Sequence, residues 1–392
     1  MAVGLLWLLG TPAGTRAQTP SPAETPTAIE VLGFLLTNQA VVTGDFTRDR
    51  TAAEMTRDTL TRALGVALAT QPLTSSSSGF AYRFNAELGT FERVSESFGP
   101  AFVERAHTAG PGQATVGMTL RYARFDRLDG RSLRDGSLVT VANRFRDEPE
   151  AFDVERLILR LQTLTLTPAV NVALSERVEV SAALPIVALE LEGERTNVYR
   201  GQTFLQASGV ARVFGPGDLV LRSKVRVAGG AGGGFALGVD LTLPTGREEN
   251  LLGAGRAGVR LLAIASAESR RTAVHVNGLA ARGGLSNEEG LGAALTLAAS
   301  PRLTFTAEIL MRRLERLRAV EPVAAPHPTI AGVETIRLLP GTSPALVSTA
   351  VVGAKWNVAD GWLLAVQAAW PMTRRGLTAA VTPAVGLEHT FP

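Results

Sequence analysis

Three basic residues at a spacing of two carry the clearest chemical signal in the sequence. In VLRSKVRV, Arg222, Lys224 and Arg226 alternate with apolar residues. A strand places alternate side chains on opposite faces, so this strand has one basic and one apolar face. If the apolar face meets lipid, the basic face must line a lumen, because each charge facing lipid costs roughly 2–4 kcal/mol at mid-membrane.

Such a basic face has two possible roles. It could attract anions into a pore, or it could form a structural network with acidic residues such as Asp240, Glu190 or Glu308. We favour the structural network, since ion pairs are the usual environment of charges inside a barrel. The candidate lumen-lining residues are Arg222, Lys224, Arg226, Asp240 and Glu308.

Two glycine-rich stretches are similar to nucleotide-binding motifs. Gly253-Ala-Gly255-Arg-Ala-Gly258 has the G-x-G-x-x-G spacing, but the residues after it alternate like a strand and no βαβ unit surrounds it. The run from Ala228 to Gly234 lacks the Lys-Ser/Thr of a phosphate-binding loop. Both are therefore interpreted as turns between strands, and no cofactor is expected.

Other chemistries have little support in the composition. The chain has no cysteine, and its four histidines are far apart, so neither a metal site nor thiol chemistry is expected. No Ser/His/Asp set with a local signature is present, so we predict no enzyme activity. The net charge is only +3 and the arginines are scattered, which argues against a nucleic-acid partner.

The N-terminus is typical of an exported protein. An apolar core, Val3 to Gly10, precedes the small residues Thr15 and Ala17, so residues 1–17 are expected to be a signal peptide, although its basic region is missing. Residues 18–78 are then expected to be a linker and a helix. Thr51 and Glu54 form a capping box, and apolar residues at helical spacing predict a helix over 51–69.

From residue 79 to 392 the period of the apolar residues is two, which predicts a β-barrel. Short connections alternate with the long segments 128–153, 192–216 and 317–343, as in outer-membrane barrels. The piece at 80–94 would be either an additional strand, which together with a partner strand would give a barrel of fourteen strands, or part of a plug. Twelve strands are predicted near residues 113–127, 160–174, 178–191, 217–228, 235–245, 254–267, 272–282, 288–299, 302–316, 345–357, 361–373 and 377–392.

The fold class is thus all-β, a transmembrane antiparallel up-and-down barrel with a short N-terminal helical segment. The strands have membrane-spanning length, and Trp356, Trp362 and Trp370 lie at strand ends. A secreted soluble β-sandwich is the alternative that alternation alone leaves open. The last strand ends in Phe391, which we expect the barrel-assembly machinery to recognise.

Several turns resemble those of a known family. The residues are Phe98-Gly-Pro-Ala-Phe-Val-Glu-Arg-Ala106, Leu128-Asp-Gly130 with Leu133-Arg-Asp-Gly136, Gly217-Asp-Leu219, Leu243-Pro-Thr-Gly246 and Glu249-Asn-Leu-Leu-Gly-Ala-Gly255. Over about 75–392 the chain resembles the outer-membrane barrels of the phenol-degradation MetA-pathway type. The resemblance implies an exported bacterial barrel that moves small hydrophobic or aromatic compounds, and it supplies no functional residues.

The sequence therefore predicts a passive outer-membrane channel in contact with lipid and a small solute, with the 51–69 helix as plug or gate. The alternative is a barrel without transport that uses its long loops as a structural or surface-interaction protein.

Overall fold

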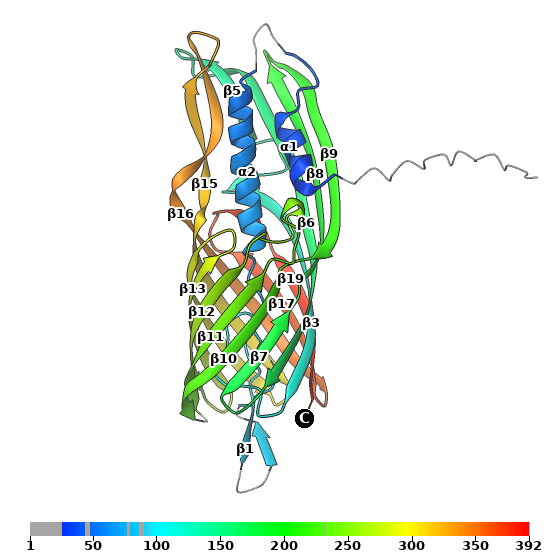
Figure 1. Ribbon diagram of the computed structural model, residues 1–392, viewed down its shortest axis with the longest axis vertical. Helices are drawn as coiled ribbons and strands as arrows, with labels where there is room; N and C mark the ends of the chain where they lie inside the picture. Colours follow the sequence, from blue (N-terminus) through cyan, green and yellow to red (C-terminus); the bar gives the residue numbers. More distant parts are fainter. Residues whose placement is uncertain are drawn as a thin grey trace, which may run out of the picture.

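A computed structural model describes residues 26–43, 48–76, 79–85, 90–93, 95–230 and 232–391. The expected signal peptide, residues 1–17, lies outside these ranges. The molecule is elongated, with a barrel at one end and two helices inside a curved sheet at the other (Figure 1). We call the barrel end, where the C-terminus lies, the short-turn end, and the opposite end the helix end.

Twelve strands of the described chain form a closed antiparallel ring, which confirms the predicted fold class. The last strand closes the ring on the first, with Leu387 opposite Met118. In order around the barrel the strands are β3 (Ala114–Leu128), β6 (Ala151–Ala173), β7 (Val178–Ala183), β10 (Leu219–Gly230), β11 (Gly233–Leu243), β12 (Gly258–Glu268), β13 (Thr272–Gly283), β14 (Glu288–Ser300), β15 (Leu303–Pro326), β16 (Val333–Ala359), β17 (Trp362–Pro371) and β19 (Thr382–Phe391).

The ring is polar inside and apolar outside. Lys224 and Asp240 point inward and are 1% exposed, whereas their neighbours Val225 and Val239 are 42% and 40% exposed. Soluble proteins rarely expose a continuous apolar surface of this extent, so it is a lipid-facing surface. Exposed apolar residues recur around the ring at Met118, Leu164, Leu221, Leu237, Leu261, Val276, Leu291, Ile309, Val352, Val366 and Leu387.

The connections of the ring differ in length at its two ends. At the short-turn end β12 and β13 are separated by residues 269–271, and β14 and β15 by residues 301–302. At the other end, residues 244–257 connect β11 to β12 and include the short helix η1 (Glu248–Asn250). The strands therefore follow the alternation of short and long connections that the sequence indicates.

The three predicted long loops are largely strands, so their interpretation as loops is wrong. β5 (Leu138–Phe145), β8 (Ile186–Tyr199) and β9 (Gln202–Pro216) join the extended parts of β6, β15 and β16 in a sheet of order β9-β8-β6-β5-β16-β15. This outer sheet continues the barrel wall and curves around the helices (Figure 1). The short strands β4 (Arg131–Ser132) and β18 (Leu377–Ala379) pair with β3.

The predicted strand 178–191 is interrupted, and two strands replace it. β7 ends at Ala183, and β8 begins at Ile186 after Leu184 and Pro185. Proline has no N–H for a strand ladder, and the chain changes partner there. β7 pairs with the lower part of β6 and with β10, whereas β8 pairs with the upper part of β6 and with β9.

Two helices form where the sequence predicts one. α1 (Ala28–Thr37) lies in the expected linker, and a capping box of Thr27 and Glu30 begins it. α2 (Arg50–Ala69) begins after Asp49, whose side chain accepts from the Ala52 N–H, so Asp49 is the cap in place of Thr51. Neither helix in the described ranges is both long and apolar enough to cross a bilayer.

The described residues of the piece at 80–94 form no additional ring strand, and only its first residue, Phe80, packs inside the barrel, against Phe98 and Leu363. β1 (Tyr82–Asn85) and β2 (Thr90–Arg93) pair with each other in a separate sheet beyond the short-turn end (Figure 1). The fourteen-strand alternative is therefore not observed among the described residues.

The helices pack inside the outer sheet through a shared apolar core. Leu32 and Leu35 of α1 and Leu60 and Leu64 of α2 are almost fully buried against Leu157 and other wall residues. The apolar residues of the outer sheet therefore point inward, whereas those of the ring point outward. The apolar face of the wall therefore faces lipid in the ring and forms a hydrophobic core with the helices in the outer sheet.

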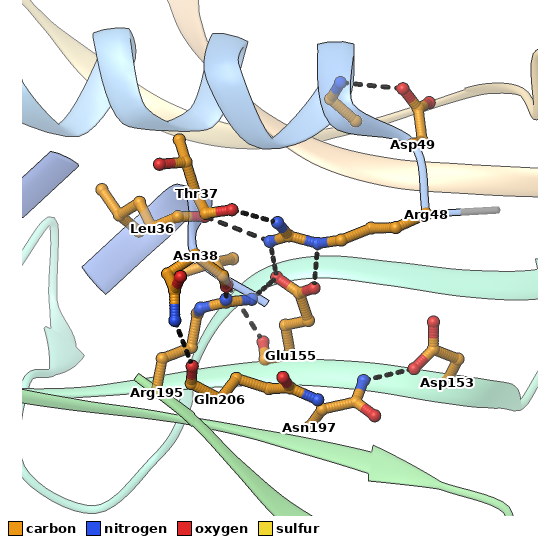
Figure 2. A network of polar contacts seen from close by, with 12 residues as sticks. Leu36, Thr37, Asn38, Arg48, Asp49, Asp153, Glu155, Arg195, Asn197 and Gln206 are labelled. Carbon is orange, nitrogen blue, oxygen red and sulfur yellow. Dashed lines mark hydrogen bonds and ion pairs between the residues drawn. The ribbon is translucent and has the colours of Figure 1, made fainter. Parts of the chain in front are cut away.

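A buried network fixes the C-terminal end of α1 to the outer sheet (Figure 2). Arg48 donates to the Leu36 and Thr37 carbonyls at 3.1 and 2.8 Å and binds both oxygens of Glu155 at 2.6 and 2.7 Å. Arg195 donates to the Leu35 carbonyl at 2.6 Å and pairs with Glu155 at 2.5 Å. The last carbonyls of a helix lack partners within the helix, and the two guanidinium groups supply them.

Candidate functional site: the occupied lumen

A stretch of irregular chain occupies the lower part of the lumen. Residues 98–109, which we call the inner segment, precede β3 and are buried along almost their whole length. Successive residues contact β15, β16, β13, β12, β10 and β7, so the segment passes across much of the inner wall. The interior of the barrel is thus formed by wall side chains together with the backbone of this segment.

Glu308 on β15 binds three consecutive N–H groups of the inner segment. Its carboxylate accepts from Ala101, Phe102 and Val103, the last two at 2.9 Å. On the next strand, the Lys355 ammonium donates to the Pro100 carbonyl at 3.1 Å. The carboxylate accepts from three N–H groups and the ammonium donates to one carbonyl, so the backbone of the segment contacts both buried charges.

Polar side chains on β12 and β13 hold the middle of the inner segment. The Asn277 amide accepts from the Glu104 N–H at 2.6 Å and donates to the Glu104 carbonyl at 3.0 Å, as a neighbouring strand would. The Ser266 hydroxyl accepts from the Ala106 N–H and bonds to Nδ1 of His275. The serine and histidine therefore lie beneath the segment and position its backbone.

Lys224 lies where the end of the inner segment meets β10. Its ammonium donates to the Arg105 and His107 carbonyls at 3.1 and 3.0 Å and pairs with Glu179 at 3.1 Å. Glu179 also accepts from the Ala109 N–H. Acceptors thus surround this cation, which is 1% exposed.

Arg222 connects the wall to the inner segment through two carboxylates. Its guanidinium binds both oxygens of Asp240 on β11, at 2.6 and 2.8 Å, and also pairs with Glu104. Of the predicted residues, Arg222 and Asp240 contact each other, whereas Lys224 and Glu308 hold different parts of the segment. Arg226 is partly buried near the short-turn end, and its side chain has no partner in the described part of the chain.

A second piece of chain, residues 70–76, connects α2 to the lower lumen, and we call it the crossing segment. Arg312 on β15 donates to the Thr70 carbonyl, and Arg121 on β3 donates to the Pro72 carbonyl at 3.1 Å. The Ser75 N–H then donates to the Ala101 carbonyl of the inner segment. The crossing segment therefore follows the axis from the helix end toward the short-turn end.

Sequence reasoning missed several wall charges that hold or flank these segments. Alternation does place Arg121 and Arg260 on the inward face of their strands, so the signal was available. Asp240 and Glu288 both lie within 4 Å of Arg260, and Glu288 also pairs with Arg312 at 3.6 Å. The upper lumen is therefore lined by alternating charges.

The prediction that the 51–69 helix plugs the lumen needs correction. α2 lies above the ring in the core of the outer sheet, and extended chain occupies the lumen instead. An α-helix with its side chains is about 10–12 Å wide, whereas an extended segment leaves its N–H and C=O groups free to bind the wall. The cavities found inside the ring have volumes of about 50 to 120 Å³, room for a few water molecules each.

The G-x-G-x-x-G stretch belongs to the loop above the ring, as the sequence indicates. Asp218 holds this loop by accepting from the Gly246 and Ala254 N–H groups at 3.0 and 2.7 Å. A Cβ at Gly253 would lie 2.4 Å from the Asp218 carboxylate, which accounts for the glycine. Burial raises the pKa of Asp218, and the two backbone donors only partly offset that effect.

No group of three or more potential His, Cys, Asp or Glu ligands with metal-binding geometry occurs in the described ranges. The arrangement that is present binds backbone groups of the chain itself. Its chemistry is the pairing of wall charges with a segment that fills the lumen.

Known proteins are similar to this chain only at a distance. No family model and no curated protein matches the sequence. An outer membrane channel from Pseudomonas putida F1 is 14% identical with a TM-score of 0.48, over 73% of this chain and 98% of that one. The transport unit of the autotransporter AIDA-I from Escherichia coli is 8% identical with a TM-score of 0.37, over 71% and 90%. The translocator domain of the autotransporter NalP from Neisseria meningitidis is 11% identical with a TM-score of 0.36, over 71% and 88%.

Proposed function

We propose that this chain is an outer-membrane channel for passive passage of small solutes, closed in this structure by its inner and crossing segments. The observation that carries the proposal is that charged wall residues bind the backbone of a separable segment. Glu308 and Lys224 direct their charges to N–H and C=O groups of residues 101–107. If the segment withdraws, it leaves a charged, hydrophilic wall.

The number of strands supports this reading. A barrel of about eight strands is filled by its own side chains, whereas 16 to 18 strands leave an aqueous channel. A ring of twelve lies between these cases, and here additional chain fills its interior. The same chain can open the lumen by moving, without any change in the ring.

The ring supports a proposed orientation in the membrane. Short turns and the C-terminus of single-chain bacterial barrels face the periplasm, so we assign the short-turn end to that side and the helix end to the outside. The exposed apolar surface contacts outer-membrane lipid, and we keep the expectation that the assembly machinery recognises the strand ending at Phe391. We further propose that the chain belongs to the phenol-degradation barrel family and that its solutes are small hydrophobic or aromatic compounds.

A reversible disulfide tests the proposed channel. A Cβ added at Gly292 on β14 would lie 3.1 Å from Cγ2 of Val103, close to the separation of about 3 Å between Cβ and the opposite Sγ in a disulfide. Because the chain has no cysteine, the double variant Val103→Cys with Gly292→Cys forms one defined bond. In planar bilayers we expect stepwise openings with reductant, and none after oxidation.

The matched control links elements outside the lumen. A Cβ at Gly209 on β9 would lie 3.1 Å from Cγ1 of Val31 on α1, so Val31→Cys with Gly209→Cys joins helix to outer sheet. This variant should conduct equally in both redox states. If the reduced lumen variant and the wild type are silent while retaining folded-barrel mobility in gels, the channel proposal is wrong.

A barrel without transport remains the second candidate, and one observation favours it. The outer sheet extends beyond the ring, and β9 and the upper part of β15 each lack a strand partner on one side among the described residues. Unpaired edges can accept a strand from another protein. Deleting residues 319–344, the upper β15–β16 hairpin, should then abolish surface binding in a barrel that conducts neither before nor after the deletion.

A further inference from the structure

A cavity of about 980 Å³ lies at the helix end, between the two helices and the loop that follows β11. Its walls include residues of α1, α2, the loop 248–256 and the upper parts of β15 and β16. The volume is at the upper end of the range found for small-molecule sites, about 300–1,000 Å³. The apolar part of its lining is Ile29, Val66, Leu251, Leu285 and Pro340.

The charges around this cavity are predominantly positive. Five arginines and three carboxylates line it. Arg57 pairs with Asp58, and Arg318 donates to two backbone carbonyls. The remaining arginine side chains are exposed and have no partner in the part of the chain that the structure describes; they are Arg62, Arg256 and Arg316.

The cavity adjoins the upper lumen. Leu251 and Gly253 line it from one side and also line a cavity of about 120 Å³ within the ring. The inner cavity is bordered by Asp240 and Arg260 of the wall. A single loop, held by Asp218, therefore separates the large outer cavity from the lumen.

We propose that this cavity binds a small anion with an apolar body, in which a carboxylate or similar group is attached to a hydrocarbon portion. The three guanidinium groups supply positive charge and the paired N–H donors that a carboxylate accepts. The apolar lining matches the body of the ligand. The inference deepens the proposed function, on which it rests, because the cavity then selects the class of solute that reaches the lumen.

Binding of benzoate to the full chain in nanodiscs of phosphatidylcholine at low ionic strength tests the site. Titration calorimetry would compare benzoate with benzyl alcohol, which keeps the ring, and with acetate, which keeps the charge. We expect benzoate to bind at least about tenfold more tightly than either comparator. Replacing Arg62, Arg256 and Arg316 by Gln should weaken benzoate binding about tenfold and leave benzyl alcohol unchanged.

The control removes equal charge from other exposed positions, Arg160, Arg177 and Arg302, and should retain benzoate binding. Equal loss in both triple variants, or equal affinity for benzoate and benzyl alcohol, would overturn the site. Displacement of benzoate by lipopolysaccharide at a concentration lower than that of benzoate would overturn the site and assign the arginines to lipid phosphate instead.

The locked variant with cysteines at 103 and 292 separates this inference from the channel. Because neither cysteine position lines the large outer cavity, the locked variant should bind benzoate with unchanged affinity although it does not conduct. Benzoate binding by a protein that never conducts would refute only the channel. Conductance without arginine-dependent binding would refute only the site.

Discussion

Glu308 shows how one side chain can retain a whole segment. It is 2% exposed, and its carboxylate takes the place of water as acceptor for three N–H groups that belong to no helix or strand. A carboxylate can accept several hydrogen bonds at once, whereas an amide offers one acceptor oxygen. The same logic, with the charge reversed, applies to Lys224 and the two carbonyls that it binds.

Replacing Glu308 by Gln should open the channel more often. The amide would place its own N–H donors against a backbone N–H, and each buried donor left without an acceptor costs about 1–3 kcal/mol. If that cost falls only on the closed state, the ratio of open to closed times should rise roughly tenfold or more in single-channel records. Glu289→Gln, on the exposed face of β14, should behave like the wild type; identical records for both variants would contradict the role of Glu308.

Part of this site could be predicted from the sequence. Alternation assigns Arg222, Lys224, Asp240 and Glu308 to one face of their strands, because each strand must keep charge away from lipid. The pairing of the basic face with Asp240 was among the predictions, but the partners in the inner segment could not be predicted. The inner segment has no periodic pattern, and the wall binds much of its backbone in addition to the side chains of Glu104 and His107.

At the scale of elements, α1 depends on a buried charge group more than on its own length. It has only ten residues, and an isolated helix of that length is marginal in water. Its last turn is held by Arg48 and Arg195, both of which rely on Glu155 for their counter-charge (Figure 2).

Glu155→Gln should therefore release α1. Removing one member of a buried ion pair leaves uncompensated charge and typically costs about 3–5 kcal/mol. Hydrogen exchange measured by mass spectrometry should become at least a hundredfold faster in α1, with β10 to β14 unaffected. Glu192→Gln breaks an exposed pair with Arg160 and serves as the control. Unchanged protection of α1 in Glu155→Gln would show that apolar packing alone retains the helix.

The twelve ring strands were predictable because lipid outside and charge inside impose a strict period of two. The outer sheet was not predictable. Its apolar residues keep the period of two, but they point inward, whereas those of the ring point outward. Leu189 and Leu191 of β8 are buried against the helices, whereas Glu190 pairs with Arg212 at the surface. The length of a segment predicted as a loop thus gave no indication that the segment extends the neighbouring barrel strand.

For the whole molecule, the N-terminal part of the chain and the start of β3 lie at opposite ends. α1 and α2 are at the helix end, and Ala114 begins β3 at the short-turn end. The segments between them run through the ring. The chain therefore crosses the membrane once before its first ring strand begins.

Cysteine labelling of intact cells tests this path. Glu54 on α2 and Glu148 between β5 and β6 are exposed at the helix end, and Arg302 is exposed at the short-turn end. A membrane-impermeant maleimide should label Glu54→Cys and Glu148→Cys on intact cells, and Arg302→Cys only after lysis. Labelling of position 148 without position 54 would place the helices on the periplasmic side, contrary to the structure.

The closure of β19 on β3 around the crossing and inner segments has a consequence for biogenesis. A folded helical pair cannot pass through a ring that already holds the inner segment, so the N-terminal part must be exported unfolded or enclosed before the seam between first and last strands is sealed. α1 and α2 can acquire their shape only on the far side, where the outer sheet supplies their core. Either route brings the N-terminal part of the chain to the helix end before the outer sheet can supply the core of the two helices.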